Sequence, residues 1–494
     1  MAPRLRYPPP SKEAAALGCG RIAAEARAAQ AVWAARPLRE RLRTVRVLRH
    51  RAAAGARDLV RAAGGGGERP EAEVLSSEVV PLLDACRFLE REAAHLLSPR
   101  RVASEGRPFW LTGVDAEVRR EPLGVVLLIA PSNYPLFLPG VQAVQALAAG
   151  NAVLWKPGRG GLPAARALAA LAAGAGVDPR LLGVLPEEPE AARAALAAGV
   201  DKVLLTGSAA TGRAVLAELA GRLVPATMEL SGCDALFVLP GADLDRVARA
   251  VRFGLTLNAG ATCIAPRRVF VPRAVAGELA DRIAELAAAL PAVTVDPEVA
   301  CRARVLAAGA LEGGARLLAG SLEPADDFQP LVVADALPTM RLLQEDLFAP
   351  AVSLVSVGDV EEALADDALC PYALAVSIFG PEGEARALAG RVRAGVVVIN
   401  DVIVPTADPR LPFGGRGESG FGVTRGAEGL LDLTVPKVVA VRRGRQLPHL
   451  GKRHPEDAAL FHAYLTLTHA GELRARFRGA AGLLRALIRR GRGA

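Results

Sequence analysis

At 494 residues, of which 51% are hydrophobic, the chain is long enough for about three domains with large cores. Its six cysteines lack the close spacing of a disulfide framework or a zinc motif, which predicts a reducing, cytoplasmic compartment and no metal site. No run of about 18 apolar residues predicts a membrane-spanning helix. Residues 441–494 carry twelve Lys or Arg against three Asp or Glu, so the net charge of +8 belongs to the tail, and nucleic acid is not an expected partner.

The first part of the chain has the spacing of amphipathic helices. Apolar residues recur at helical intervals through residues 11–63, and a further helix is expected over 71–97, after the glycine run 64–67. Residues 107–120 alternate apolar and polar positions and predict a pair of strands.

From residue 121 onward, strands and helices alternate. The expected strands are 124–130, 152–157, 181–186, 202–207 and 226–230. The expected helices between them are 138–149, 161–174, 188–199 and 211–221. This alternation predicts a parallel, doubly wound sheet, in which ligands bind beyond the carboxyl ends of the strands. Asn133, Lys156, Gly207 and Glu229 all follow or close such strands, which predicts that they share one site.

A second α/β region is expected after residue 240. Its predicted strands are 268–272, 316–320, 331–335, 352–357, 375–380 and 395–400. Its predicted helices are 242–256, 275–289, 298–309 and 382–392. A glycine-rich loop over 411–422 and a late strand over 430–442 complete the region.

Two short stretches carry candidate chemistry. Cys263 lies among small residues in LNAGATCI (257–264), and Glu229 ends an apolar run in TMELSG (227–232). A thiol and a carboxyl, each beside backbone that can bend tightly, suggest a nucleophile and a base. A buried structural cysteine and a surface glutamate are the alternative interpretation. Because no histidine lies between His95 and His449, a carboxylate or water is favoured as the proton acceptor for the thiol.

Seven motifs, in order, resemble those of the aldehyde dehydrogenase superfamily across about residues 20–442. They are APSNYPL (130–136), GNAVLWKP (150–157), LLTGSAATG (204–212), MELSG (228–232), NAGATC (258–263), EDLFAP (345–350) and PFGG (412–415). The resemblance implies an α/β fold with two doubly wound parallel-sheet domains and a small β bridging element. It implies a dinucleotide-binding domain (1–106 and 121–231), a catalytic domain (232–423), oligomerisation strands (107–120 and 424–442) and a basic C-terminal tail (443–494).

The resemblance also implies an activity and the residues that carry it. The implied reaction is oxidation of an aldehyde to a carboxylate with NAD or NADP, by the non-acylating route. Cys263 would form a thioester, Glu229 would activate the hydrolytic water, and Asn133 would stabilise the oxyanion. The implied cofactor-binding residues are Lys156, Gly207, Ser208, Gly212, Asp346 and Phe348. The bridging element implies a homodimer or a homotetramer.

Three positions depart from the pattern of the superfamily. Arg159 stands where a ribose-binding glutamate is common, Asp346 replaces a glutamate, and residues 231–235 read SGCDA. Because a guanidinium can bind phosphate in a bidentate way, Arg159 is added to the cofactor-binding residues and acceptance of NADP is predicted. The identity of the aldehyde is not indicated by the sequence.

Two other functions are considered. The first is an acylating or reducing enzyme that uses CoA or an acyl donor, against which Glu229 argues. The second is a scaffold with weak catalysis and a membrane-associating tail. The tail segment 471–492 predicts a basic amphipathic helix, for which packing on its own or a neighbouring subunit is favoured over weak contact with a membrane surface. Its apolar face would consist of Phe477, Ala480, Ala481, Leu484, Leu487 and Ile488.

Overall fold

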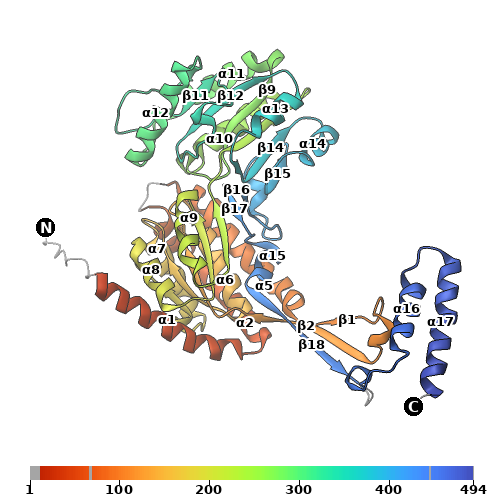
Figure 1. Ribbon diagram of the computed structural model, residues 1–494. Helices are drawn as coiled ribbons and strands as arrows, with labels where there is room; N and C mark the ends of the chain where they lie inside the picture. Colours follow the sequence, from red (N-terminus) through yellow and green to blue (C-terminus); the bar gives the residue numbers. More distant parts are fainter. Residues whose placement is uncertain (1–11, 66–68, 444–446, 493–494) are drawn as a thin grey trace. The chain divides into compact units, whose positions relative to one another are not determined.

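The structure is a computed structural model that describes residues 12–65, 69–443 and 447–492 (Figure 1). The chain forms two compact units. The larger unit comprises the chain up to Arg100 together with residues 118–438. The smaller unit comprises residues 101–117 and the chain from Val439 onward.

The chain begins with the helical region that the apolar spacing predicts. Its helices are α1 (Lys12–Ala34), α2 (Leu38–Ala54), α3 (Ala56–Ala63), α4 (Glu71–Val74) and α5 (Val80–Leu97). The helix expected over 71–97 is confirmed, except that a π-helical turn, η1 (Leu75–Val79), joins α4 to α5. Residues 66 and 67 of the glycine run lie outside the described residues.

The first sheet is parallel apart from one edge strand, as the alternation predicts. Its order is β17-β7-β6-β3-β4-β5. The strands are β3 (Val125–Ile129), β4 (Ala152–Lys156), β5 (Leu182–Val184), β6 (Lys202–Gly207), β7 (Ala226–Leu230) and the antiparallel β17 (Gly420–Phe421). The helices are α6 (Phe137–Ala149), α7 (Leu162–Gly174), α8 (Pro189–Ala198) and α9 (Ala209–Ala220). Because parallel crossovers are right-handed, the strand order places α6 and α7 on one face of the sheet and α8 and α9 on the other.

The second sheet has the order β10-β11-β12-β9-β8-β14-β15 and occupies the other half of the larger unit (Figure 1). Its strands are β8 (Asp234–Val238), β9 (Pro266–Pro272), the antiparallel β10 (Arg316–Ala319), β11 (Leu331–Ala334), β12 (Ala351–Val357), β14 (Ala375–Phe379) and β15 (Val396–Ile399). Its helices are α10 (Leu244–Thr256), α11 (Arg273–Ala288), α12 (Pro297–Glu312), α13 (Val360–Asp367) and α14 (Glu382–Ala389). Strand β8 was not expected, because its first residues read as the loop after Glu229.

Shorter elements complete this part of the chain. Strand β13 (Tyr372–Ala373) pairs with β16 (Arg416–Gly417), and α15 (Gly426–Asp432) follows the glycine-rich loop. The late strand is confirmed as β18 (Thr434–Arg442), but residues 430–432 belong to α15.

The prediction of a strand pair within residues 107–120 is wrong. Residues Phe109–Leu111 form a 3₁₀ turn, and a single strand, β2 (Val114–Pro122), follows it. Gly113 has a φ of 84°, so the chain turns immediately before the strand and leaves no room for a hairpin. Strand β2 instead lies between β1 (Arg100–Val102) and β18 in a three-stranded sheet.

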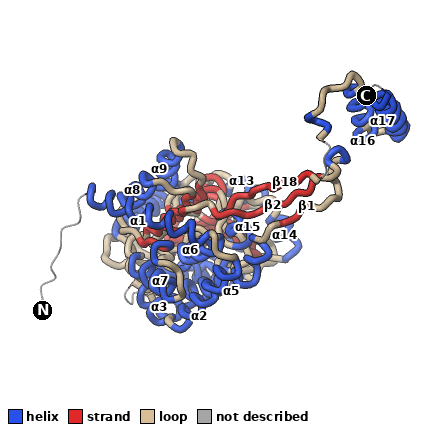
Figure 2. Tube along the Cα trace, turned by 90° about the horizontal axis from the view of Figure 1, so that it is seen from below, coloured by secondary structure: helices blue, strands red, loops and turns tan. Residues whose placement is uncertain are grey.

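The tail folds into two helices, α16 (Asp457–His469) and α17 (Leu473–Arg492), which lie side by side (Figure 2). Gly479 and Gly482 of α17 face α16, because a Cβ at Gly479 would meet the backbone of Leu467 and one at Gly482 would lie 3.2 Å from the Cβ of Ala463. The larger apolar side chains of the predicted face, Phe477, Leu484, Leu487 and Ile488, are exposed. None of the described helices has the length and apolarity needed to cross a membrane.

Candidate active site

Cys263 follows a segment with an unusual backbone. Helix α10 leads into the turn η4 (Leu257–Gly260), in which Asn258, Ala259 and Gly260 have φ angles of 50°, 51° and 74°. A Cβ at Gly260 would lie 2.6 Å from the Cα of Pro350, so this left-handed position accepts glycine alone. The small residues that the sequence places before Cys263 therefore allow a tight approach of two backbone segments.

Cys263 and Glu229 line one cavity of about 180 Å³. The cavity wall is largely apolar and includes Phe137, Phe253 and Phe413. Cys263 is partly exposed, whereas Glu229 is buried at the carboxyl end of β7. The structure therefore brings together the thiol and the carboxyl that the sequence singled out, and neither of them has the environment of the alternative interpretation.

The Glu229 carboxylate is incompletely paired. Its Oε2 accepts a hydrogen bond from the Thr424 hydroxyl at 3.1 Å, while Oε1 has no partner in the described part of the chain. Burial raises the pKa of Glu229, and the charge of Arg425 and the Thr424 hydrogen bond oppose that shift. A buried carboxyl with a raised pKa and a free oxygen has the properties of a general base.

The surroundings of Cys263 disfavour its thiolate. Burial raises the pKa of the Cys263 thiol, and the nearby carboxyls of Glu229, Asp234 and Asp346 raise it further. The Arg425 guanidinium acts in the opposite direction. The thiolate is the nucleophilic form of cysteine. The reactivity of Cys263 therefore depends on how the charges around it shift its pKa.

Asn133 is held against the Cys263 loop by several hydrogen bonds. Its Nδ2 donates to the carbonyl of Ala261 at 2.8 Å, and Asn258 Nδ2 donates to the Asn133 carbonyl at 2.8 Å. The Tyr134 hydroxyl and the Thr262 hydroxyl are 2.6 Å apart. A primary amide has two N–H donors, so Asn133 keeps one for an oxyanion.

The loop that carries Asn133 is anchored by Glu78, which was not predicted from the sequence. Glu78 is fully buried, and its Oε2 accepts hydrogen bonds from the backbone N–H groups of Leu136 (3.0 Å) and Phe137 (2.7 Å). Its Oε1 accepts from the Arg69 guanidinium at 2.8 Å. A carboxylate in the apolar stripe of a predicted helix was the signal that could have identified it.

Arg69 ties the same cluster to the Cys263 loop. Its guanidinium donates to Glu73 Oε1 at 3.1 Å and lies 5.5 Å from the centre of the Tyr134 ring. Glu73 Oε1 also accepts from the backbone N–H of Asn258 at 3.2 Å. The charged side chains of Arg69, Glu73 and Glu78 thus contact both loops of the site.

The predicted cofactor residues lie at the carboxyl edge of the first sheet. Lys156 ends β4 and is half-buried; burial lowers its pKa, while the charges of Glu187 and Glu188 oppose that shift. Gly207 ends β6, and Ser208 caps α9 by accepting a hydrogen bond from the backbone N–H of Thr211 at 3.2 Å.

Gly212 and Arg159 have other contacts in this structure. A Cβ at Gly212 would lie 2.9 Å from the side chain of Leu230, so this glycine lets α9 pack closely on β7. Arg159 is exposed and forms an ion pair with Asp296 at 3.0 Å. Its guanidinium is therefore directed to the N-terminus of α12.

Asp346 and Phe348 lie between η5 (Arg341–Leu343) and β12, and both are half-buried. Burial raises the pKa of Asp346 to about 6, although Ser231 and Arg267 oppose this. The charge of Asp346 also raises the pKa of Cys263.

These groups fit a dinucleotide. Lys156 is a half-buried cation, and no acceptor for its ammonium is found in the described chain. The start of α9, which follows β6 at the same carboxyl edge of the sheet, presents backbone N–H groups and a helix dipole, which is the chemistry that phosphates require.

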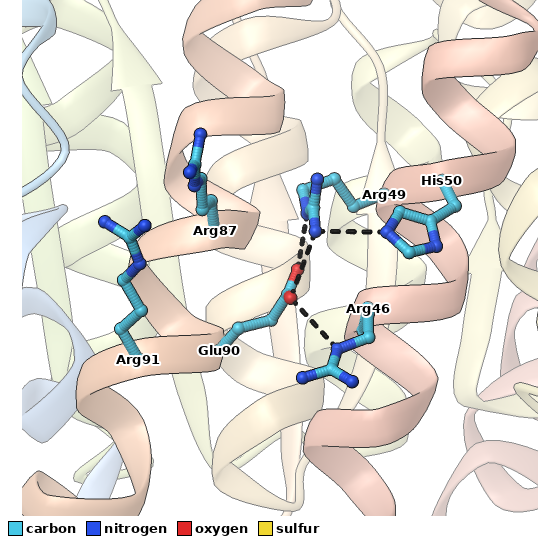
Figure 3. A pocket seen from close by; sticks show the side chains of 6 residues that line it. All are labelled: Arg46, Arg49, His50, Arg87, Glu90 and Arg91. Atoms are coloured by element: carbon cyan, nitrogen blue, oxygen red, sulfur yellow. Dashed lines mark hydrogen bonds and ion pairs between the residues drawn. The ribbon is translucent and has the colours of Figure 1, made fainter.

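A second cavity, of about 350 Å³, lies between α2 and α5 (Figure 3). There Glu90 Oε1 accepts from Arg49 at 2.5 Å, and Arg46 lies 3.3 Å from Oε2. Arg87 and Arg91 project from α5 without a marked bond in Figure 3. None of the predicted site residues lines this cavity.

Comparisons with known proteins agree with the site. The family model described as the aldehyde dehydrogenase family matches residues 12–439. The chain belongs to the aldehyde dehydrogenase family.

Individual relatives of this family cover most of the chain. A provisionally named NADP-dependent succinate-semialdehyde dehydrogenase of Mycobacterium ulcerans is 33% identical over 85% of this chain and 83% of its own. The 4,4'-diapolycopene aldehyde oxidase of a Methylomonas species is 32% identical over 76% and 72%. The solved aldehyde dehydrogenase of Mycobacterium tuberculosis in complex with NAD+ has a TM-score of 0.80 and 27% identity, over 88% of this chain and 92% of its own.

Proposed function

We propose that the protein oxidises an aldehyde to a carboxylate with NAD or NADP as the hydride acceptor. The supporting observation is that the Cys263 thiol and the incompletely paired Glu229 carboxylate face one largely apolar cavity. Family membership agrees with this reaction. The name of the mycobacterial relative includes NADP, and the solved relative from Mycobacterium tuberculosis contains NAD+, so both dinucleotides are considered.

In the proposed mechanism, the Cys263 thiol gives its proton to water, and the Sγ of the resulting thiolate attacks the carbonyl carbon of the aldehyde. The oxygen becomes anionic and is stabilised by the free N–H of Asn133 and by the backbone N–H of Cys263. The dinucleotide, when bound, supplies the acceptor for the hydride that leaves this carbon. The acyl group then remains on Cys263 as a thioester. Glu229 takes a proton from water, the resulting hydroxide attacks the thioester carbon, and the carboxylate product departs from the thiol.

Lys156, Ser208 and Gly207 are proposed to hold the adenosine and pyrophosphate part of the dinucleotide, and Asp346 with Phe348 the part near Cys263. Gly212 is proposed to contribute by letting α9 approach the sheet. Arg159 is proposed to leave Asp296 and bind a 2′-phosphate, which would permit NADP. The negative charges of Glu187 and Glu188 near Lys156 oppose the binding of a further phosphate, so the preference between NAD and NADP is to be measured.

The experiment uses the purified protein with a panel of aldehydes and both dinucleotides, and records the absorbance of the reduced cofactor. The panel contains carboxylate-bearing and apolar aldehydes. We expect Cys263→Ala to remove the activity, whereas Cys301→Ala, a change at an exposed cysteine, should retain it. Substantial oxidation by Cys263→Ala would contradict the proposal. A requirement for CoA would favour an acylating enzyme, and no turnover with any aldehyde would favour a scaffold.

The predicted domains and partners remain part of the proposal. Exposed Val435, Val438 and Val441 on β18 support pairing between subunits in a homodimer or a homotetramer. α17 packs on α16 through Gly479 and Gly482, while its exposed apolar face, with arginines beside it, supports weak contact with an anionic membrane surface or packing on a neighbouring subunit. The cytoplasmic location continues to rest on the cysteine usage of the sequence.

A further inference from the structure

Arg425 is a buried cation in the wall of the cavity that holds Cys263 and Glu229. Its side chain is 4% exposed, and it is the one basic residue in this wall among the residues that the structure describes. Its Nη1 donates to the carbonyl of Thr406 at 2.7 Å, and its Nε has no hydrogen-bond partner. A buried guanidinium with incomplete hydrogen bonding is costly unless a nearby negative charge compensates for it.

The guanidinium of Arg425 lies near two aromatic rings, and the backbone of this residue is strained. The guanidinium carbon lies 4.3 Å from the centre of the Phe413 ring and 5.5 Å from that of Phe137. The backbone of Arg425 has φ 62° and ψ 177°, a region that is occupied almost only by glycine. Strain of this kind at a non-glycine residue points to a role in function, because packing alone would not select it.

The charges around the cavity indicate what Arg425 compensates. Glu229 on β7 shares the cavity with Cys263, and the carboxyls of Glu229, of Asp234 on β8 and of Asp346 before β12 all raise the pKa of the Cys263 thiol. Arg267 on β9 is a second buried cation near Cys263. Its guanidinium is occupied, however, by the carbonyl of Ala349 at 2.7 Å and by that of Gly260.

Arg425 interacts electrostatically with Glu229 and Cys263 together. We propose that Arg425 is a positioning residue whose fixed positive charge holds Glu229 as a carboxylate and favours the thiolate of Cys263. The inference rests on the proposed function. It differs from the interpretation of Arg425 as a group that binds a carboxylate of the substrate, because it concerns the protein before any ligand arrives.

The test measures the reactivity of Cys263 in the full-length protein without aldehyde or dinucleotide. Cys263 is alkylated with iodoacetamide from pH 6 to 10, and mass spectrometry follows the peptide that contains it, so that the other cysteines do not interfere. Arg425→Gln removes the charge but keeps a donor for Thr406, and Arg425→Lys keeps the charge. Arg386→Gln, at an exposed ion pair with Glu382, is the control.

We expect Arg425→Gln to lower the alkylation rate at pH 8 about tenfold, because an opposite charge nearby shifts a pKa by about one unit or more. Arg425→Lys and Arg386→Gln should stay within about threefold of the parent. In steady-state turnover, the acid limb of the kcat profile of Arg425→Gln should move to higher pH by about one unit, since Glu229 would then stay protonated longer.

Three results would overturn the proposal. The first is an alkylation profile of Arg425→Gln that overlays the parent, with KM raised for carboxylate-bearing aldehydes, because Arg425 would then bind substrate. The second is an Arg425→Lys profile that is shifted as far as that of Arg425→Gln. If Arg425→Gln fails to fold, a shifted Arg425→Lys profile alone refutes the role of charge, and an unshifted one supports it. The third is an unmoved acid limb in a folded Arg425→Gln variant. Failure of the proposed function would appear separately, as aldehyde oxidation by Cys263→Ala.

Discussion

Replacing Glu78 with glutamine removes a buried carboxylate from the anchor of the Asn133 loop. Burial raises the pKa of Glu78 to about 6 from 4.5, even though Arg69 and the backbone N–H groups of Leu136 and Phe137 oppose the shift. A difference of roughly 1.5 units corresponds to about 2 kcal/mol, since one unit is worth about 1.4 kcal/mol. Because the pKa of Glu78 is higher in the folded state, the protonated carboxyl contributes this amount to the free energy of unfolding below pH 4.5. The contribution is lost as the pH rises through about 6.

Glutamine does not ionise, so the variant lacks this loss. The difference between the unfolding free energies of parent and Glu78→Gln should therefore change by about 2 kcal/mol between pH 4 and pH 7, in favour of the variant at the higher pH. The assay is urea unfolding at both pH values, followed by the fluorescence of the buried Trp33 and Trp155. Glu92→Gln, at an exposed position of α5, is the control and should show no such change. A difference that is independent of pH would refute the reasoning.

The same substitution should lower activity, because a glutamine amide cannot accept from Arg69 and from both backbone N–H groups at once. Asn133 would then move relative to Cys263, and a displacement of about 1 Å can cost on the order of 100-fold in rate. We expect kcat to fall by about 10- to 100-fold. An unchanged kcat would show that the Asn133 loop keeps its position without this carboxylate.

Three further predictions concern the site and the tail. Glu229→Gln should release one burst of reduced cofactor and then turn over at least about 100-fold more slowly, because the thioester forms but is not hydrolysed; a parental steady-state rate would exclude Glu229 as the base. Arg159→Glu should lower the ratio of kcat/KM for NADP over NAD by about tenfold through repulsion of a 2′-phosphate, and an unchanged ratio would remove Arg159 from the cofactor site. Truncation after Arg443 should abolish the salt-sensitive co-sedimentation of the protein with anionic liposomes, whereas equal partitioning of both forms would exclude the tail from membrane contact.

The sequence was sufficient for the parallel strands of the first sheet and for the residues at their ends, but not for β8 of the second sheet or for the three-stranded sheet of β1, β2 and β18. Lys156 and Glu229 could be assigned to one edge because parallel strands direct their carboxyl ends the same way. Glu78 and Arg425 could not be identified as site residues from the sequence, because their roles come from contacts with distant parts of the chain. Glu78 binds the backbone of Leu136, which is 58 residues away, and Arg425 packs on the ring of Phe137. Arg159 shows the same limit, since its partner Asp296 lies 137 residues away and is not visible in any local pattern.

The two-residue strand β17 has a consequence for the entry of substrate. It pairs Gly420 with Glu229 and Phe421 with Met228, so that the glycine-rich loop closes the edge of the first sheet beside the proposed base. The backbone N–H of Leu230 donates to the carbonyl of Ser419 at 3.1 Å, which extends this ladder. Because β17 joins the first sheet after β15, the last strand of the second sheet, the chain between β15 and β17 ties the two halves of the larger unit together. Access to the cavity is therefore expected to depend on local motion of the turn η6 (Val404–Ala407), which lines the cavity wall, and amide exchange at Leu230 should stay slow during turnover.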